Sequence, residues 1–203
     1  MEIILATTNP SKVEQIALIL NSSSHNVISM HKAGVIGEAV EDGTTLEQNA
    51  FKKAIFAWQQ TKTWCMADDT GIFIDALDGL PGINAARWAG EVSTEAIMQH
   101  TLTQLVGVRS DERTATFKTS AVVITPSGDS VTFTGELRGS ILMEAKVPCQ
   151  PKMPYSAIFQ PHGHSKVWAE MTTEEENEIS HRGQAFAQVR TFLEQRSTSS
   201  SET

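Results

Sequence analysis

The stretch EIILATTNPSKVEQIALIL, residues 2–20, decides how the chain begins to fold. Its first five residues, EIILA, form a short run with high β propensity, and apolar residues then recur from position 13 to position 20 with the spacing of one helix face. Between these runs, Asn9 is a good N-cap and Pro10 is a good first helical residue. The sequence therefore predicts a strand, a loop and an amphipathic helix.

Further along the chain, strand and helix signals continue to alternate. A second helix should begin near Thr44 or Thr45, because each threonine has an acidic or amide residue three positions later. Residues 64–77 contain two apolar runs around DDTG, which predicts a strand, a turn and a second strand. A Gly- and Pro-containing loop follows, and then a helix is expected around residues 94–106.

The second half of the chain predicts a hairpin, a loop and two helices. Residues 114–125 and 130–137 flank PSGD and should pair as antiparallel strands. Residues 146–154 are rich in proline and should form a loop. The C-terminal region predicts two helical segments that are broken near residues 181–183, and STSSSET, residues 197–203, is expected to be a disordered polar tail.

Composition limits the possible classes of protein. The 203 residues are 40% apolar and 20% charged, so we expect one domain, residues 1–196, with helices around a mixed sheet. No apolar run approaches the ~18 residues of a membrane span, and no signal peptide is recognisable, so we expect a cytoplasmic protein without membrane association. Cys65 and Cys149 have no metal-binding spacing and should be free thiols.

The formal charge of −8 argues against a nucleic-acid partner, because binding to a phosphate backbone needs clustered Lys and Arg. An acidic protein can still bind a single polyphosphate if a divalent cation bridges its carboxylates to the phosphates. Carboxylates are therefore the first candidates for chemistry.

The segment TTNPSK offers a possible phosphate site at the predicted strand-to-helix junction. It combines the hydroxyls of Thr7 and Thr8, the amide of Asn9 and the ammonium of Lys12 where a helix N-terminus favours anions. Taken alone, helix capping and a solvated lysine explain these residues better, because such residues occur at most helix starts.

The acidic residues Glu41, Asp68 and Asp69 form a second candidate group. Magnesium prefers oxygen ligands and commonly uses one or two carboxylates. Adjacent aspartates on an extended strand face opposite ways, so one could bind a metal while the other meets a water molecule. Taken alone, an ordinary solvated turn explains the DD pair of DDTG better than a metal site does. In the same way, His181 and Arg182 in SHRG could meet a purine-like base, yet alone they are a weak signal.

Taken in order, these segments resemble the inosine triphosphate pyrophosphatase family over about residues 3–192. The family motifs ATxNxxK, ETGxTFxENAxxKA and ADDSGLxVDALxGxPGxxSAR correspond to ATTNPSK, EDGTTLEQNAFKKA and ADDTGIFIDALDGLPGINAAR. The later motifs GExxGxI, GFGYDPxF and ISHRG correspond to GELRGSI, MPYSAIF and ISHRG. Several motifs in the correct order are far more specific than any one of them, and this favours the functional interpretation.

The resemblance implies a two-lobed α/β fold, with a long mixed β-sheet flanked by helices and a central nucleotide-binding cleft. The implied reaction is attack of water on the α-phosphorus of a nucleoside triphosphate with a non-standard base, giving the nucleoside monophosphate and pyrophosphate. Magnesium is the implied cofactor, with manganese as the alternative, and the implied assembly is a homodimer.

The resemblance also implies roles for individual residues. Asp69 would bind the metal together with Glu41, and it would orient or deprotonate the attacking water, a task that Asp68 could share. The division of these roles between the two aspartates stays open. The residues implied in substrate binding are Thr7, Thr8, Asn9, Lys12, Lys53, Thr70, Arg87, Tyr155, Ser156, His181 and Arg182.

Three departures from the family pattern fall on the side that the resemblance assigns to the base. MPYSA replaces the family's GFGYDP, so Tyr155 remains but Ser156 stands where the family has aspartate. Glu176 aligns with a family lysine, and Ala85 aligns with a serine. We therefore expect a working pyrophosphatase with an altered or looser base preference. The alternatives are a catalytically weak nucleotide-binding or sensor dimer and a pyrophosphatase for pyrimidine or modified nucleotides.

Overall fold

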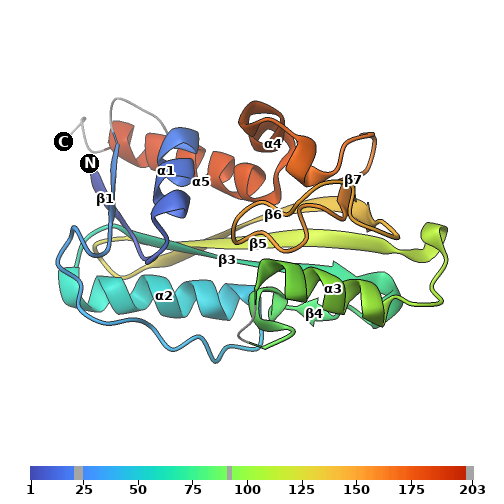
Figure 1. Ribbon diagram of the computed structural model, residues 1–203. Coiled ribbons are helices and arrows are strands. Elements are labelled where there is room, and N and C mark those ends of the chain that lie inside the picture. Colours follow the sequence, from blue (N-terminus) through green and yellow to red (C-terminus); the bar gives the residue numbers. More distant parts are fainter. Residues whose placement is uncertain (21–24, 91–92, 200–203) are drawn as a thin grey trace. The chain divides into compact units, whose positions relative to one another are not determined.

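The computed structural model describes residues 1–20, 25–90 and 93–199 of the chain, shown in Figure 1. By its internal contacts the chain divides into two compact units. Unit 1 comprises Met1–Asp69, Thr119–Gly135 and Arg182–Thr203, and unit 2 comprises Thr70–Lys118 and Glu136–His181.

The helices and strands form a mixed α/β structure. Their bounds are β1 (Glu2–Leu5), α1 (Pro10–Ile19), β2 (Asn26–Ser29), α2 (Leu46–Thr61), β3 (Cys65–Ile74), β4 (Pro81–Gly82), α3 (Thr94–Gln104), β5 (Thr114–Ile124), β6 (Ser130–Ile141), β7 (Phe159–Pro161), α4 (Thr173–Ile179) and α5 (His181–Ser199). The strand order is β2-β1-β3-β5-β6-β7, and β4 pairs with β3. Strand β1 runs parallel to β2 and β3, whereas β3 with β4 and β6 with β7 are antiparallel. This mixed sheet with helices confirms the predicted fold class.

Alternation along the strands of unit 1 produces two apolar faces. Ile3, Leu5 and Met66 pack in one buried cluster with apolar residues of α1 and α5. Their neighbours Ile4 and Ala67 pack in another buried cluster with the alanines of α2. Successive side chains of a strand point to opposite faces, so one strand sequence supplies both clusters. Figure 1 shows the same arrangement, with α1 and α5 on one side of the sheet and α2 on the other.

The structure shows which of the two predicted threonines, Thr44 or Thr45, caps the start of α2. The hydroxyl of Thr45 accepts a hydrogen bond from the amide of Gln48 at 3.1 Å, so Thr45 is the N-cap. The hydroxyl of Thr44 instead donates to the side-chain oxygen of Gln48 at 3.0 Å. Only Thr45 satisfies one of the free amides in the first turn of the helix.

Replacing Thr45 by alanine is expected to lower the free energy of unfolding by about 1 kcal/mol, because the amide of Gln48 loses its acceptor. For a chain of this size that change corresponds to a melting temperature lower by about 2–4 °C. Thr44→Ala is the matched control and should change stability by less than about 0.5 kcal/mol. Equal losses in the two variants, measured by thermal unfolding, would contradict the assignment of the cap.

The predicted turn at DDTG was wrong, because β3 continues through it as one strand of 10 residues. Gly71 explains the continuity. A Cβ atom at Gly71 would lie 2.5 Å from the carbonyl oxygen of Gly82 in β4, so glycine allows the two backbones to approach closely. The glycine that resembles a turn signal in the sequence serves strand pairing in the structure. Asp68 and Asp69 consequently lie inside a strand and not at its end.

The predictions for the second half of the chain are largely confirmed. Strands β5 and β6 are neighbours in the sheet as expected, and β6 continues to Ile141. The predicted helix near residue 94 is α3. The predicted loop at residues 146–154 has no regular structure beyond an isolated bridge between Gln150 and Met153.

The two C-terminal helices are also present, but the break between them is at Ser180, one residue earlier than predicted. Ser180 has extended backbone angles, φ −64° and ψ 142°, which end α4. Helix α5 continues to Ser199, three residues into the predicted polar tail, and residues 200–203 of that tail lie outside the described residues. In the described part of the chain, no helix combines the length and the hydropathy that a membrane span needs.

Candidate active site

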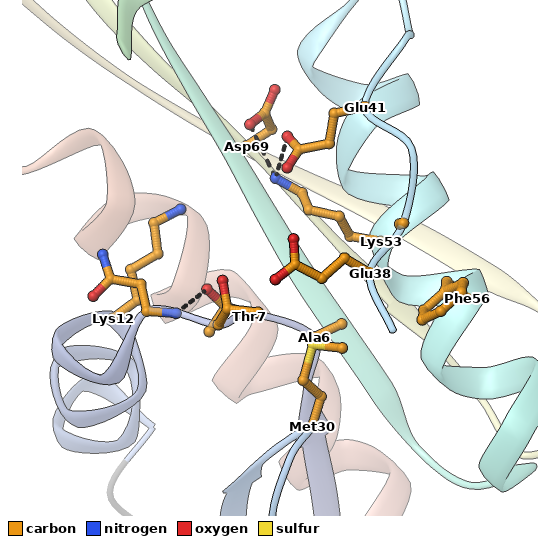
Figure 2. A pocket seen from close by; sticks show the side chains of 12 residues that line it. Ala6, Thr7, Lys12, Met30, Glu38, Glu41, Lys53, Phe56 and Asp69 are labelled. Atoms are coloured by element: carbon orange, nitrogen blue, oxygen red, sulfur yellow. Dashed lines mark hydrogen bonds and ion pairs between the residues drawn. The ribbon is translucent and has the colours of Figure 1, made fainter. Parts of the chain in front are cut away.

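A pocket of about 200 Å³ lies in unit 1 beside the end of β1, the start of α1, the helix α2 and the strand β3 (Figure 2). Its lining includes seven of the predicted site residues: Thr7, Thr8, Asn9, Lys12, Glu41, Lys53 and Asp69. Sites for whole small-molecule ligands usually start near 300 Å³, so this pocket matches part of a nucleotide, such as its phosphates.

One wall of the pocket is the loop between β1 and α1. The hydroxyl of Thr7 accepts a hydrogen bond from the amide of Asn9 at 3.2 Å, which holds the loop in a tight conformation. The carbonyl of Asn9 then accepts from the amide of Lys12 at 3.1 Å as the helix begins. The predicted junction is therefore present, and its position at a helix N-terminus favours an anion.

The opposite wall carries Asp69, whose two carboxylate oxygens both accept hydrogen bonds from α2. Lys53 donates to Oδ1 at 3.0 Å, and Asn49 donates to Oδ2 at 3.2 Å. These two donors are four residues apart and so stand on the same face of the helix. Lys53 also donates to Oε2 of Glu41 at 3.2 Å, so its ammonium lies between two carboxylates, as the dashed lines in Figure 2 show.

Lys53 is charged in this surrounding. Burial acts to lower the pKa of its ammonium, but the carboxylates of Asp69, Asp68 and Glu41 outweigh burial and raise that pKa above its ordinary value. The pocket therefore contains a positive charge where the predicted metal ligands meet.

Asp68 faces the other side of β3, as expected for adjacent residues of a strand. Its carboxylate accepts from the ammonium of Lys12 at 3.1 Å and from Nε of Arg182 at 3.2 Å. Arg182 also donates through Nη1 to Oε1 of Gln15 at 2.8 Å. Only 1% of the Asp68 side chain is exposed. The two aspartates thus have separate partners, and Lys12 connects the Asp68 side to the pocket.

The charge of Asp68 is fixed by its neighbours. Burial alone would raise the pKa of the Asp68 carboxyl, but the cations of Lys12, Arg182 and Lys53 together hold it well below its usual range. For Lys12, burial lowers the pKa more than the single carboxylate of Asp68 raises it, and the charges of Arg182 and Lys53 lower it further. The partners of Asp68 therefore favour its ionised form.

The fit of a metal ion can be judged from the donors in the pocket. The described residues contain no group of three or more His, Cys, Asp and Glu side chains that could hold a metal ion. Glu41 and Asp69 nevertheless share one cation, the ammonium of Lys53. Magnesium commonly binds through one or two carboxylates and completes its shell with water and substrate phosphates. The carboxylates of Glu41 and Asp69, beside a pocket of the size of a phosphate chain, fit this mode of coordination.

The predicted residues of unit 2 have other partners. The hydroxyl of Tyr155 is buried and donates to the carbonyl of Ala85 at 2.8 Å, and burial raises its pKa. The ring of His181 stacks on Phe117 with 5.0 Å between ring centroids. Arg87 is exposed, and its Nε donates to Asn84 at 3.4 Å. Thr70 is half-buried on β3. A role of these residues in substrate binding stays a prediction.

Two of the departures from the family pattern are joined through Gln150. Ser156 accepts from the backbone amide of Gln150 at 2.9 Å and donates to the carbonyl of Met153 at 2.7 Å. The side chain of Gln150 donates to Glu176 at 3.0 Å. Burial raises the pKa of the Glu176 carboxyl, although this hydrogen bond acts to lower it. Ser156 and Glu176, two positions that differ from the family pattern, are therefore connected through one glutamine.

The sequence did not predict three polar residues in or beside the pocket. Glu38 adds a third carboxylate to the pocket lining, and its only sequence signal is its position three residues before Glu41. Asn49 is a polar residue on the face of α2 that also carries Leu46 and Ala50, which is a recognisable signal. Gln15, which holds Arg182, has no local signal at all.

Comparison with known proteins shows similarity over almost the whole chain. A model of the Ham1 family matches residues 3–192. A dITP/XTP pyrophosphatase of Geobacter sulfurreducens is 37% identical over 192 residues, covering 94% of this chain and 96% of that protein. A dITP/XTP pyrophosphatase of Bacillus subtilis is 35% identical over 194 residues, covering 95% and 97%. The solved structure of the Staphylococcus aureus Ham1 protein has a TM-score of 0.87 at 29% identity and covers 97% of this chain and 100% of that one. The resemblance expected from the motifs is confirmed.

Proposed function

The chain belongs to the Ham1 family, and on this basis we propose that it hydrolyses nucleoside triphosphates with non-standard bases to the monophosphate and pyrophosphate. Its relatives named dITP/XTP pyrophosphatases support this substrate class. The observation that carries the proposal is the pocket in unit 1, where a helix N-terminus and Lys12 lie across from Asp69, Glu41 and Lys53. One wall suits an anion, and the other supplies carboxylates.

In the proposed reaction the phosphates bind at the loop of Thr7, Thr8 and Asn9, with Lys12 and Lys53 offsetting their charge. Asp69 accepts a proton from a water molecule as that water forms a bond to the α-phosphorus. The bond between the α-phosphorus and the bridging oxygen breaks, and pyrophosphate leaves with the electron pair. Hydrogen bonds from Lys53 and Asn49 hold the Asp69 carboxylate in one orientation.

Glu41 and Asp69 are the residues that would hold Mg²⁺, or Mn²⁺ in its place. A bound divalent cation would supply charge neutralisation at the phosphates. Asp68 belongs to the support of the site, because its carboxylate is fully engaged by Lys12 and Arg182.

Adding a chelator is expected to lower pyrophosphate release by roughly 100-fold or more, since Lewis-acid stabilisation contributes several kcal/mol. The measurement is pyrophosphate release from ITP, XTP, dITP, dUTP and the standard nucleoside triphosphates, before and after EDTA. Restoring Mg²⁺ or Mn²⁺ should restore the rate. Release that continues unchanged in EDTA would contradict metal dependence, and binding without release from any substrate would favour a nucleotide sensor.

The same panel tests the base preference. We propose that discrimination between bases is altered, because Ser156 and Glu176, which are joined through Gln150, stand where the family pattern has aspartate and lysine. Loss of one hydrogen-bond partner for the base costs about 1–3 kcal/mol, or one to two orders of magnitude in selectivity. A strict preference for ITP and XTP would overturn this part of the proposal. The family resemblance also supports a homodimer, which sedimentation of the purified protein can test.

A further inference from the structure

Asn49 is buried on α2, with 1% of its surface exposed, and it uses both ends of its side-chain amide. Its Oδ1 accepts from the backbone amide of Gly43 at 2.8 Å, and its Nδ2 donates to Oδ2 of Asp69 at 3.2 Å. A backbone N–H can only donate and an ionised carboxylate can only accept, so these two partners fix the orientation of the amide. One side chain therefore connects the segment before α2 to the strand β3.

We propose that Asn49 is a positioning residue. It holds the carboxylates of Glu41 and Asp69 at the positions from which both can bind one metal ion, an inference that rests on the proposed function. Gly43 lies two residues after Glu41, so the bond to Gly43 anchors the segment that carries Glu41. The bond to Asp69 fixes the second carboxylate. Residues that do not bind the metal but orient its ligands commonly change metal affinity by about 10- to 100-fold when they are replaced.

Gly43 shows that this contact is built into the fold. A Cβ atom at position 43 would lie 2.6 Å from Oδ1 of Asn49 and 2.9 Å from Cβ of Gln48. The backbone of Gly43 does not have a positive φ, so a left-handed conformation does not explain the glycine. What the position requires is space for the Asn49 amide.

Asn49 and Lys53 have different tasks at Asp69. Lys53 brings a positive charge that both Glu41 and Asp69 share, and an arriving metal ion would compete with that charge. Whereas Lys53 donates to Oδ1, Asn49 is neutral and donates to Oδ2 of Asp69 without bringing a charge. Its contact can thus persist when a cation occupies the pair of carboxylates.

Gln48 provides a matched control on the same helix. Its Oε1 accepts from the amide and the hydroxyl of Thr44 at 2.8 and 3.0 Å, so it also ties the segment before α2 to the helix. Its side chain binds Thr44 and not a carboxylate. A variant of Gln48 therefore weakens the attachment of the segment and leaves the contact with Asp69 in place.

The test measures Mn²⁺ affinity by electron paramagnetic resonance without nucleotide, together with pyrophosphate release as a function of Mg²⁺. Asn49→Ala is expected to raise the Kd for Mn²⁺ by about 10-fold or more and to raise the Mg²⁺ concentration for half-maximal rate. Gly43→Ala should shift both in the same direction, because its Cβ would displace Oδ1 of Asn49. Gln48→Ala should stay within about twofold of the natural protein.

Several outcomes would overturn the positioning role. They are an unchanged Mn²⁺ affinity in Asn49→Ala, an equal loss in Gln48→Ala, and a natural protein that releases pyrophosphate but binds no Mn²⁺ on its own. If thermal unfolding shows that Asn49→Ala does not fold, Gly43→Ala decides the question. A natural protein that neither binds Mn²⁺ nor releases pyrophosphate contradicts the proposed function itself. A natural protein that does both, with variants identical to it, contradicts only the role of Asn49.

Discussion

Replacing Asp69 by asparagine is expected to lower pyrophosphate release by a factor of about 10³ or more while the protein stays folded. General base catalysis contributes typically 10²–10⁴-fold, and an amide can neither accept the proton of the attacking water nor offer a metal ion a charged ligand. The protein should stay folded because the Asp69 side chain is 14% exposed and Asn retains one oxygen for Lys53. The new amide nitrogen, however, faces Nδ2 of Asn49, which loses its acceptor, so we expect a cost in stability of about 1–2 kcal/mol. The loss of activity should appear in kcat and be far larger than this change in stability explains.

Glu47→Gln is a suitable control for the Asp69 variant. Glu47 is an exposed acid on α2 that accepts from the hydroxyl of Thr132 at 3.0 Å, outside the pocket lining. The Glu47→Gln variant removes one negative charge near the same helix, so it shows how much the loss of a charge alone changes the rate. A rate of Asp69→Asn above about a tenth of the natural rate would exclude Asp69 as the base.

Local patterns predicted most of the elements near the site. The spacing of apolar residues after residue 10 predicted α1. Two neighbouring threonines, each with Glu47 or Gln48 three residues later, predicted the start of α2 but not which threonine is its cap. These signals come from residues close together in sequence, which is why they could be read without the fold. The loop of Thr7 to Asn9 at the start of α1 was expected for the same reason.

The features that the sequence predicted wrongly or not at all depend on contacts between residues far apart in the chain. DDTG was predicted as a turn because Gly71 is a turn residue, whereas its small size serves the approach of β4. Strand alternation predicted that Asp68 and Asp69 would face opposite ways, but not which cations each would meet. Asp68 binds Arg182 across 114 positions of sequence, and no local pattern reports a contact of that separation. The link from Ser156 to Glu176 through Gln150 is hidden for the same reason.

Replacing Asp68 by asparagine is expected to lower the free energy of unfolding by about 3 kcal/mol, more than the Asp69 variant does. Removing one partner of a buried ion pair leaves an uncompensated charge and typically costs 3–5 kcal/mol. The lower end applies here because the side chains of Lys12 and Arg182 are 24% and 16% exposed, so water can partly solvate them. Chemical denaturation of both variants measures the difference.

The kinetic effect of Asp68→Asn should also differ from that of Asp69→Asn. Lys12 loses the carboxylate that holds it beside the pocket, so substrate binding should weaken and KM should rise more than kcat falls. A double-mutant cycle of Asp68→Asn with Arg182→Gln should show coupling in stability, because both variants remove the same ion pair. If Asp68→Asn instead kept full stability and lost kcat as severely as Asp69→Asn, Asp68 would take part in the chemistry. The two aspartates would then share the role of general base, and the ion pairs of Asp68 with Lys12 and Arg182 would have to break during turnover.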